Sequence, residues 1–139
     1  MRDDLHQYLR PRLIACVLVG LFGAGGTCLR IGVDRLVPQS SDGWPWPTFL
    51  VNVVGAALAG YIVTHVIDRS HERSRLRLAV GTGFFGGLTT FSALQVDAVR
   101  LTHRGHPLEA ISYLLATILC GIAAAAIATR AARQGWRAA

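Results

Sequence analysis

The residues most suited to chemistry lie together between Gly81 and Leu94, where the sequence reads GTGFFGGLTTFSAL. Four of the first seven residues are glycine, and three hydroxyl side chains and the ring of Phe91 follow. No charged residue occurs from Leu78 to Val96, so the stretch belongs to an apolar span nearly long enough to cross a bilayer. Each glycine costs a helix interior about 1 kcal/mol relative to alanine, which predicts a membrane helix that is weakened or broken here. Backbone groups freed by such a break need protein, water or an ion as partners.

Glycines alone are equally consistent with close packing of helices through small residues. The hydroxyls of Thr89, Thr90 and Ser92, placed around Phe91, favour an ion site instead. An aromatic edge carries partial positive charge, and a hydroxyl can donate a hydrogen bond, so both can face an anion without a fixed cation.

Other spans contribute further polar candidates. Asn52 is the only asparagine of the chain, and its amide offers two donors without net charge, although it could also hydrogen-bond between helices. Tyr113 and Thr117 are four residues apart and therefore share one helical face, where the alternative is a bond to a backbone carbonyl. Arg30 follows a glycine-rich stretch, either reaching to the membrane interface or placing a fixed positive charge in the vestibule of an anion path.

The elements that would position these residues are four apolar spans. The chain has 139 residues, room for one domain, and 52% of them are hydrophobic, which is ordinary for a small integral membrane protein. We predict an all-α, multi-pass membrane protein whose single four-helix transmembrane domain fills residues 1–139, with the third helix broken near the membrane centre. The predicted spans are about 13–33, 49–67, 78–101 and 110–129.

Composition excludes several function classes. The formal charge of +6 comes from arginine alone, and the arginines lie between apolar spans, which favours lipid headgroups over nucleic acid as neighbours. No zinc-ligand spacing, nucleophile elbow or phosphate-binding loop is present, so we expect no enzyme. The three cysteines lie in apolar segments and should be unpaired. The spans also lack a central acidic residue, because Asp97 and Glu109 fall near predicted span ends, and this favours a passive pore over a proton-coupled carrier.

With these motifs together, the sequence resembles the Fluc/CrcB family of bacterial fluoride channels. The resemblance covers essentially the whole chain: glycines leading to Arg30, FLVNVVGAALAG in the second span and GFFGGLTTFSAL in the third. The third motif is highly specific, whereas the first is looser, with Phe22 and Thr27 where the family favours glycine and alanine. The resemblance implies a dimer of oppositely oriented subunits in the bacterial inner membrane, with two fluoride paths and a central structural sodium ion.

The resemblance also assigns residues. Gly86 and Thr89 match the positions whose backbone carbonyls hold sodium, and Arg30 is placed in the vestibule. The fluoride path is assigned to Asn52, Thr90, Phe91, Ser92, Leu94, Tyr113 and Thr117. Leu94 is a departure, because the family has a second phenylalanine there, and leucine lacks the electropositive ring edge.

The function that follows is passive, selective export of fluoride down its gradient, which relieves fluoride toxicity. Neutral donors that bind moderately at several sites are what conduction requires. The alternative is a small, also dimeric, four-helix multidrug exporter, disfavoured by the missing membrane carboxylate. A structural or assembly protein would leave Asn52 and the hydroxyl cluster without a role.

Arginine distribution predicts the orientation of the chain. Four spans place the N-terminus, the middle loop and the C-terminus on one side. That side carries ten arginines, and the other carries four: Arg30, Arg35, Arg100 and Arg104. Arginine excess marks the cytoplasmic side, so we expect both termini in the cytoplasm. The antiparallel partner is then either an oppositely oriented paralogue or, if the bias is tolerated, a second copy of this chain.

Overall fold

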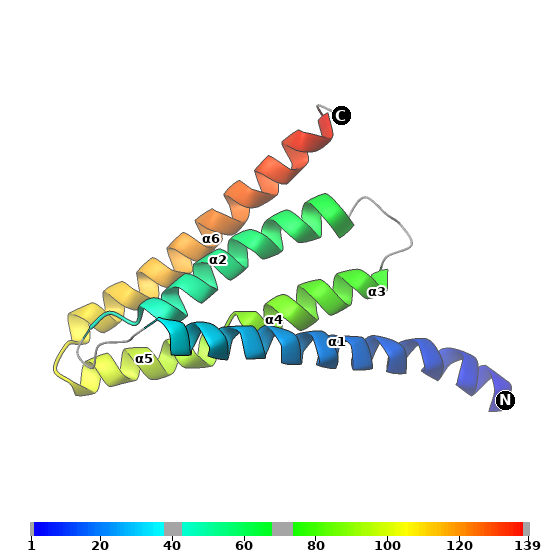
Figure 1. The fold of residues 1–139 in the computed structure, drawn as a ribbon, viewed down its shortest axis with the longest axis horizontal. Coiled ribbons are helices and arrows are strands. Elements are labelled where there is room, and N and C mark those ends of the chain that lie inside the picture. The colour runs from blue at the N-terminus through cyan, green and yellow to red at the C-terminus, as the bar shows by residue number, and fades with distance from the viewer. Residues whose placement is uncertain (1, 38–42, 68–73, 138–139) are drawn as a thin grey trace.

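The computed structural model describes residues 2–37, 43–67 and 74–137, and every regular element in these ranges is helical (Figure 1). The elements are α1 (Arg2–Leu36), α2 (Trp46–Ile62), η1 (Val63–Ile67), α3 (Ser74–Arg77), η2 (Leu78–Phe85), α4 (Gly86–Leu88), α5 (Phe91–His103) and α6 (Pro107–Arg137). The elements η1 and η2 are π-helices, which are wider than α-helices. The predicted all-α class is therefore confirmed for the described residues.

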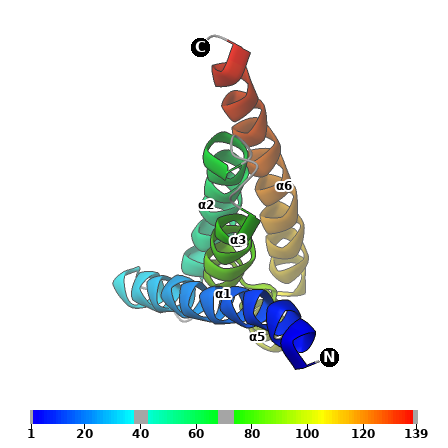
Figure 2. The same ribbon diagram turned by 90° about the vertical axis from the view of Figure 1, so that its right-hand side faces the viewer.

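The helices form an antiparallel arrangement in which the chain reverses direction after α1, after η1 and after α5 (Figure 1). Both termini consequently lie at the same end. The helix α2 packs along α6, and α1 packs on η2 and α4 (Figure 2).

The third predicted span is broken, but at Thr89 and Thr90, directly after the glycine cluster, whose own residues remain helical in η2 and α4. Thr89 has φ −77° and ψ 151°, and Thr90 has φ −146° and ψ 124°, so both residues are extended. The segment therefore consists of α3, η2 and α4 before the break and α5 after it.

Two glycines allow α1 to cross this segment at backbone contact. A Cβ atom on Gly26 would collide with the carbonyl oxygen of Phe84, and one on Gly87 would collide with that of Gly23. Any side chain at either position would push α1 away from the break. These glycines thus serve the close packing that was the alternative to an ion site.

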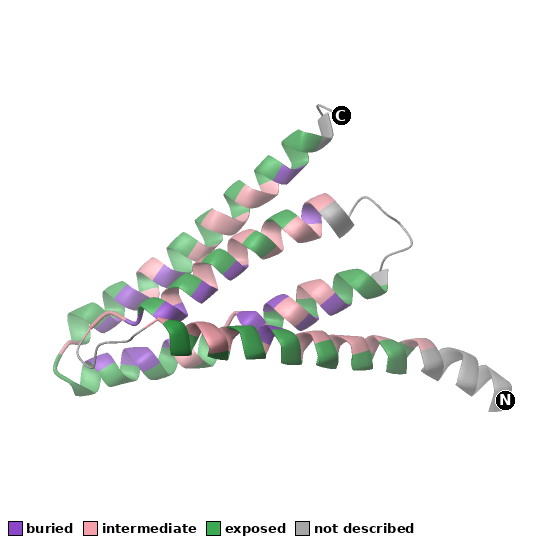
Figure 3. Ribbon diagram, in the orientation of Figure 1, coloured by how far each residue is buried: buried purple, intermediate pink, exposed green. Residues whose placement is uncertain are grey.

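Three described helices are long and apolar enough to cross a membrane: Pro11–Leu36, Trp46–His65 and Pro107–Gly135. Much of their surface is exposed within this one chain, as Figure 3 shows. Apolar side chains that face outward along such helices fit lipid or a partner subunit, and the chain is a multi-pass membrane protein. The third predicted span is not among the three, because the break divides it into pieces shorter than a membrane crossing. The count of four spans therefore stays a prediction.

The helix boundaries differ from the predicted spans mainly at polar ends. The helix α1 includes residues before the predicted start at residue 13, and α6 continues to Arg137 although the predicted span ends at residue 129. Backbone hydrogen bonding continues a helix beyond its apolar part, which hydropathy alone cannot indicate. Arg69 and Arg73, which count in the predicted orientation, lie outside the described residues.

Candidate functional site

A groove of about 510 Å³ lies beside the break, between α2, the third segment and α6. Its lining residues are Asn52, Ala56, Ala59, Gly81, Phe85, Gly86, Thr89, Thr90, Phe91, Thr117, Ile118, Gly121 and Ile122. Six of the predicted site residues are in this set: Asn52, Gly86, Thr89, Thr90, Phe91 and Thr117. None of the lining residues is charged, so the groove offers only neutral groups to an ion.

The amide of Asn52 is bound to the backbone at the break. Its Oδ1 accepts a hydrogen bond from the Thr90 N–H at 2.8 Å, and its Nδ2 donates to the Thr90 carbonyl oxygen at 3.0 Å. Since Nδ2 carries two hydrogens, one N–H of Asn52 remains available to a ligand.

The helix α5 begins at the groove. The Thr90 hydroxyl oxygen accepts a hydrogen bond from the Ala93 N–H at 3.1 Å and so caps the helix. The hydroxyls of Thr90 and Ser92 are 3.2 Å apart, and one of them donates to the other, which leaves one hydroxyl proton free. Phe91 is the first residue of α5 and is 65% exposed. A helix N-terminus carries partial positive charge, so this edge of the groove favours an anion.

Two backbone carbonyls lose their helical partners at the break. In a continuous helix the Thr90 N–H would bind the Gly86 oxygen, and the Ala93 N–H would bind the Thr89 oxygen. Both N–H groups are instead taken by side chains, namely Asn52 and the Thr90 hydroxyl. None of the side-chain hydrogen bonds found among the described residues ends on these two oxygens. A built Cβ atom on Gly86 would meet nothing within 4 Å, so this position faces open space in the single chain.

Arg30 of α1 contacts α4, just before the break. Its Nε lies 3.4 Å from the carbonyl oxygen of Gly87, and the Thr27 hydroxyl donates to the same oxygen at 3.4 Å. Arg30 does not line the groove, and its side chain reaches the Gly87 carbonyl at the end of α4. Its charge therefore lies near the C-terminal end of α4, where a helix favours a cation.

The two predicted residues of α6 differ in their surroundings. Thr117 lines the groove, but its hydroxyl donates to the Tyr113 carbonyl at 2.7 Å, the alternative left open by the sequence. Tyr113 is fully buried, and its hydroxyl lies 3.5 Å from Oδ2 of Asp97.

Leu94 and Ser92 are not among the groove-lining residues. Leu94 is 3% exposed and packs with Ala98, Leu101 and Tyr113 between α5 and α6. Ser92 is exposed beside Phe91. The position where the family has a second phenylalanine therefore belongs to the hydrophobic core in this chain.

Sequence reasoning missed a buried polar cluster around Asp97. Asp97 is 5% exposed and accepts a hydrogen bond from the Thr48 hydroxyl at 2.7 Å. Its Oδ1 lies 3.5 Å from Nη1 of Arg100. A signal was available: Asp97 is three residues after Leu94 and four before Leu101, on the apolar face of its helix.

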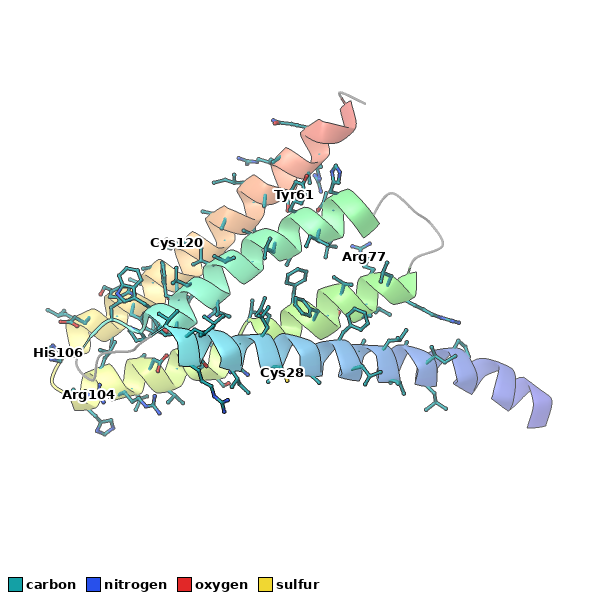
Figure 4. The ribbon with its side chains drawn as sticks, viewed as in Figure 1. Cys28, Tyr61, Arg77, Arg104, His106 and Cys120 are labelled. Atoms are coloured by element: carbon teal, nitrogen blue, oxygen red, sulfur yellow. The ribbon has the colours of Figure 1, made fainter. Side chains whose placement is uncertain are left out.

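Most other reactive side chains lie away from the groove. All three cysteines are free, as predicted, and Cys28 and Cys120 are on different helices (Figure 4). Arg104 and His106 lie at the turn between α5 and α6 (Figure 4). Among the described residues, no group of three or more histidine, cysteine or acidic side chains could hold a metal ion.

Comparison with known proteins identifies the family. The model of the CrcB-like protein family, also described as Camphor Resistance (CrcB), matches residues 17–129. The chain belongs to this family. The resemblance based on the three motifs is therefore confirmed.

Curated relatives of this CrcB-like protein are named as fluoride channels. It is 40% identical over 129 residues to fluoride-specific ion channel FluC 1 of Mycolicibacterium paratuberculosis, covering 93% of this chain and 94% of the relative. It is 41% identical over 110 residues to FluC 1 of Brucella melitensis, covering 77% and 89%. FluC 1 of Ligilactobacillus salivarius is 38% identical over 104 residues, covering 74% and 87%. Since these relatives are channels, the prediction that the chain is not an enzyme is confirmed.

Proposed function

We propose that this chain forms a fluoride-selective channel through which fluoride leaves the cell passively, relieving fluoride toxicity. The observation that carries the proposal is the uncharged groove at the break, where Asn52, Thr90 and Phe91 come together. The names of relatives that match nearly the whole chain support fluoride as the transported ion.

The available donors fit a small anion that must bind and leave. Asn52 keeps one N–H, the Thr90 and Ser92 hydroxyls keep one proton between them, and Phe91 presents an exposed ring. Thr89 and Thr117 contribute differently, because their hydroxyl protons bind the carbonyls of Phe85 and Tyr113. A few neutral donors hold an anion less tightly than an ammonium or guanidinium group would, and weak binding permits rapid exit.

We further propose that Gly86 and Thr89 hold a structural sodium ion through their backbone oxygens. The fit rests on the two carbonyls whose helical donors are diverted to Asn52 and the Thr90 hydroxyl. Two oxygens from each of two antiparallel subunits would give four oxygen ligands, which suit a hard cation. The open space at Gly86 supports a second subunit on this side of the chain.

The proposed assembly is therefore an antiparallel dimer of four-span subunits in the bacterial inner membrane. The outward apolar surfaces of α1 and α6 would face lipid or the partner subunit. The two uncapped carbonyls at Gly86 and Thr89 would then lie near the dimer axis.

The alternative, a multidrug exporter, has one new observation in its favour, since Asp97 is a buried carboxylate within α5. Such carriers need an acidic residue that faces the substrate pathway. Asp97 is bonded to Thr48, and it is not among the residues that line the groove. We therefore retain the channel.

The test is fluoride efflux from liposomes that contain the purified protein, followed with a fluoride electrode. We expect fast efflux when a potassium ionophore balances charge, and none of comparable rate for chloride. Ser112→Ala serves as a control, because Ser112 is exposed and its hydroxyl bonds the Glu109 carbonyl of its own helix. Efflux no faster than from protein-free liposomes would refute the proposed function.

A further inference from the structure

The two hydrogen bonds between Asn52 and Thr90 join residues that are 38 positions apart in the sequence. They link the Asn52 side chain of α2 to the backbone of the break. Asn52 thus bonds the backbone of the break and also lines the groove.

A carboxamide satisfies both backbone groups of Thr90 at once. An extended residue can direct its N–H and its carbonyl toward the same neighbour, as residues in an antiparallel strand pair do. Thr90 has this conformation, with φ −146° and ψ 124°. The asparagine amide presents one acceptor and one donor to it, whereas aspartate could only accept and alanine could do neither.

The pair also determines which backbone groups stay free. The Thr90 N–H is the group that would bind the Gly86 carbonyl if the helix were continuous. Because Asn52 Oδ1 takes this N–H at 2.8 Å, the Gly86 carbonyl is left without its helical donor. The Thr90 N–H therefore links the Asn52 side chain to the state of the Gly86 carbonyl.

We propose that Asn52 is a positioning residue that holds Thr90 extended and keeps the break open. Through this role it orients Phe91 at the start of α5 and leaves the Gly86 oxygen free for a cation. The consequences for transport rest on the proposed channel function, whereas the effect of Asn52 on the conformation of Thr90 does not.

This role differs from that of a residue that only binds fluoride. A residue that only binds the ion has no effect on the backbone when fluoride is absent. A residue that holds the break protects the Thr90 N–H at all times.

Amide hydrogen exchange of the purified protein in fluoride-free detergent buffer separates the two roles. In Asn52→Ala the Thr90 N–H loses its partner, and we expect its exchange to become about tenfold faster or more. In Asn52→Asp the carboxylate still accepts this N–H, so we expect exchange close to that of the unchanged protein. Val54→Ala is the matched control, since Val54 lies on the same helix, is half exposed and does not line the groove.

Exchange of Thr90 in Asn52→Ala that is unchanged or slower would overturn the proposal, whatever the efflux assay gives. Should Asn52→Ala be poorly folded, the Thr90 amide can be replaced by an ester, which deletes the N–H, leaves every side chain in place and also weakens the Thr89 carbonyl as an acceptor. We expect this ester to reduce fluoride efflux at least tenfold, while an ester at Val99, within the regular part of α5, reduces it less than twofold. Full efflux from the Thr90 ester would equally overturn the positioning role.

Discussion

The Thr48 hydroxyl donates a hydrogen bond to Oδ2 of Asp97 at 2.7 Å, which ties the start of α2 to the middle of α5. Both residues are buried, and the Tyr113 hydroxyl lies 3.5 Å from the same oxygen. A buried carboxylate is costly unless hydrogen bonds satisfy it. These contacts therefore fix α5 relative to α2 and α6.

We predict that Thr48→Val, which keeps the shape of the side chain but removes its donor, destabilises the protein by about 1–3 kcal/mol. The measurement is the midpoint of thermal unfolding in detergent. Thr102→Val is the control, because Thr102 is exposed and its hydroxyl bonds the Ala98 carbonyl of its own helix. An equal loss of stability in both variants would show that the hydrogen bond to Asp97 contributes no more to stability than a hydroxyl bond within one helix.

Two neighbouring glycines provide a second, paired prediction. Gly87→Ala would place a Cβ atom against the Gly23 carbonyl of the same chain, and we expect it to destabilise the subunit itself, by about 1–3 kcal/mol. Gly86→Val meets open space within the chain, so its subunit should stay folded while the sodium site and dimer weaken. Thr89→Ser should be mild, because the hydroxyl that donates to Phe85 is kept.

The effect of each variant on the sodium site is measured by how the thermal unfolding temperature changes with sodium concentration. An ion that binds only the folded dimer stabilises that dimer more as the ion concentration rises. We expect unfolding temperature to rise with sodium in the unchanged protein and in Thr89→Ser, but not in Gly86→Val. If Gly86→Val is dimeric, fully active and equally sensitive to sodium, the cation site must lie elsewhere.

How much of this site can be predicted from the sequence depends on how far apart in the sequence the contacting residues are. The glycines before Thr89 indicate locally that the helix is weak, so a break in this stretch could be predicted, although it falls just after the glycines instead of among them. The partner of Thr90 could not, because nothing local specifies that Asn52, 38 residues earlier, satisfies its backbone. Assigning Leu94 to the fluoride path followed the family motif, whereas the structure places its side chain in the core between α5 and α6.

A third prediction concerns the ring at the start of α5. Phe91→Leu keeps an apolar side chain but removes the electropositive ring edge. We expect fluoride efflux to fall at least tenfold with little change in stability, since the ring is 65% exposed and holds no core together. Val96→Ala is a control on the same helix, exposed and outside the groove. Efflux from Phe91→Leu equal to that from Val96→Ala would remove Phe91 from the path.

The last prediction concerns orientation and partner. The start of α1, the end of η1, the start of α3 and the end of α6 lie at one end of the described structure (Figure 1). We therefore expect the arginines of the N-terminal, middle and C-terminal segments to share a side of the membrane. Ten arginines belong to that side of the sequence and four to the other. An excess of this size orients a membrane protein with the arginine-rich side in the cytoplasm. A chain that inserts equally in both directions should have little such excess.

We therefore expect a cysteine added at the C-terminus, in a variant without Cys16, Cys28 and Cys120, to resist impermeant thiol reagents in intact cells. The antiparallel partner would then be a separate, oppositely oriented paralogue, and this chain alone should give little efflux in liposomes unless that partner is added. Equal labelling from both sides, with full efflux from this chain alone, would instead establish a dual-topology homodimer that tolerates the bias.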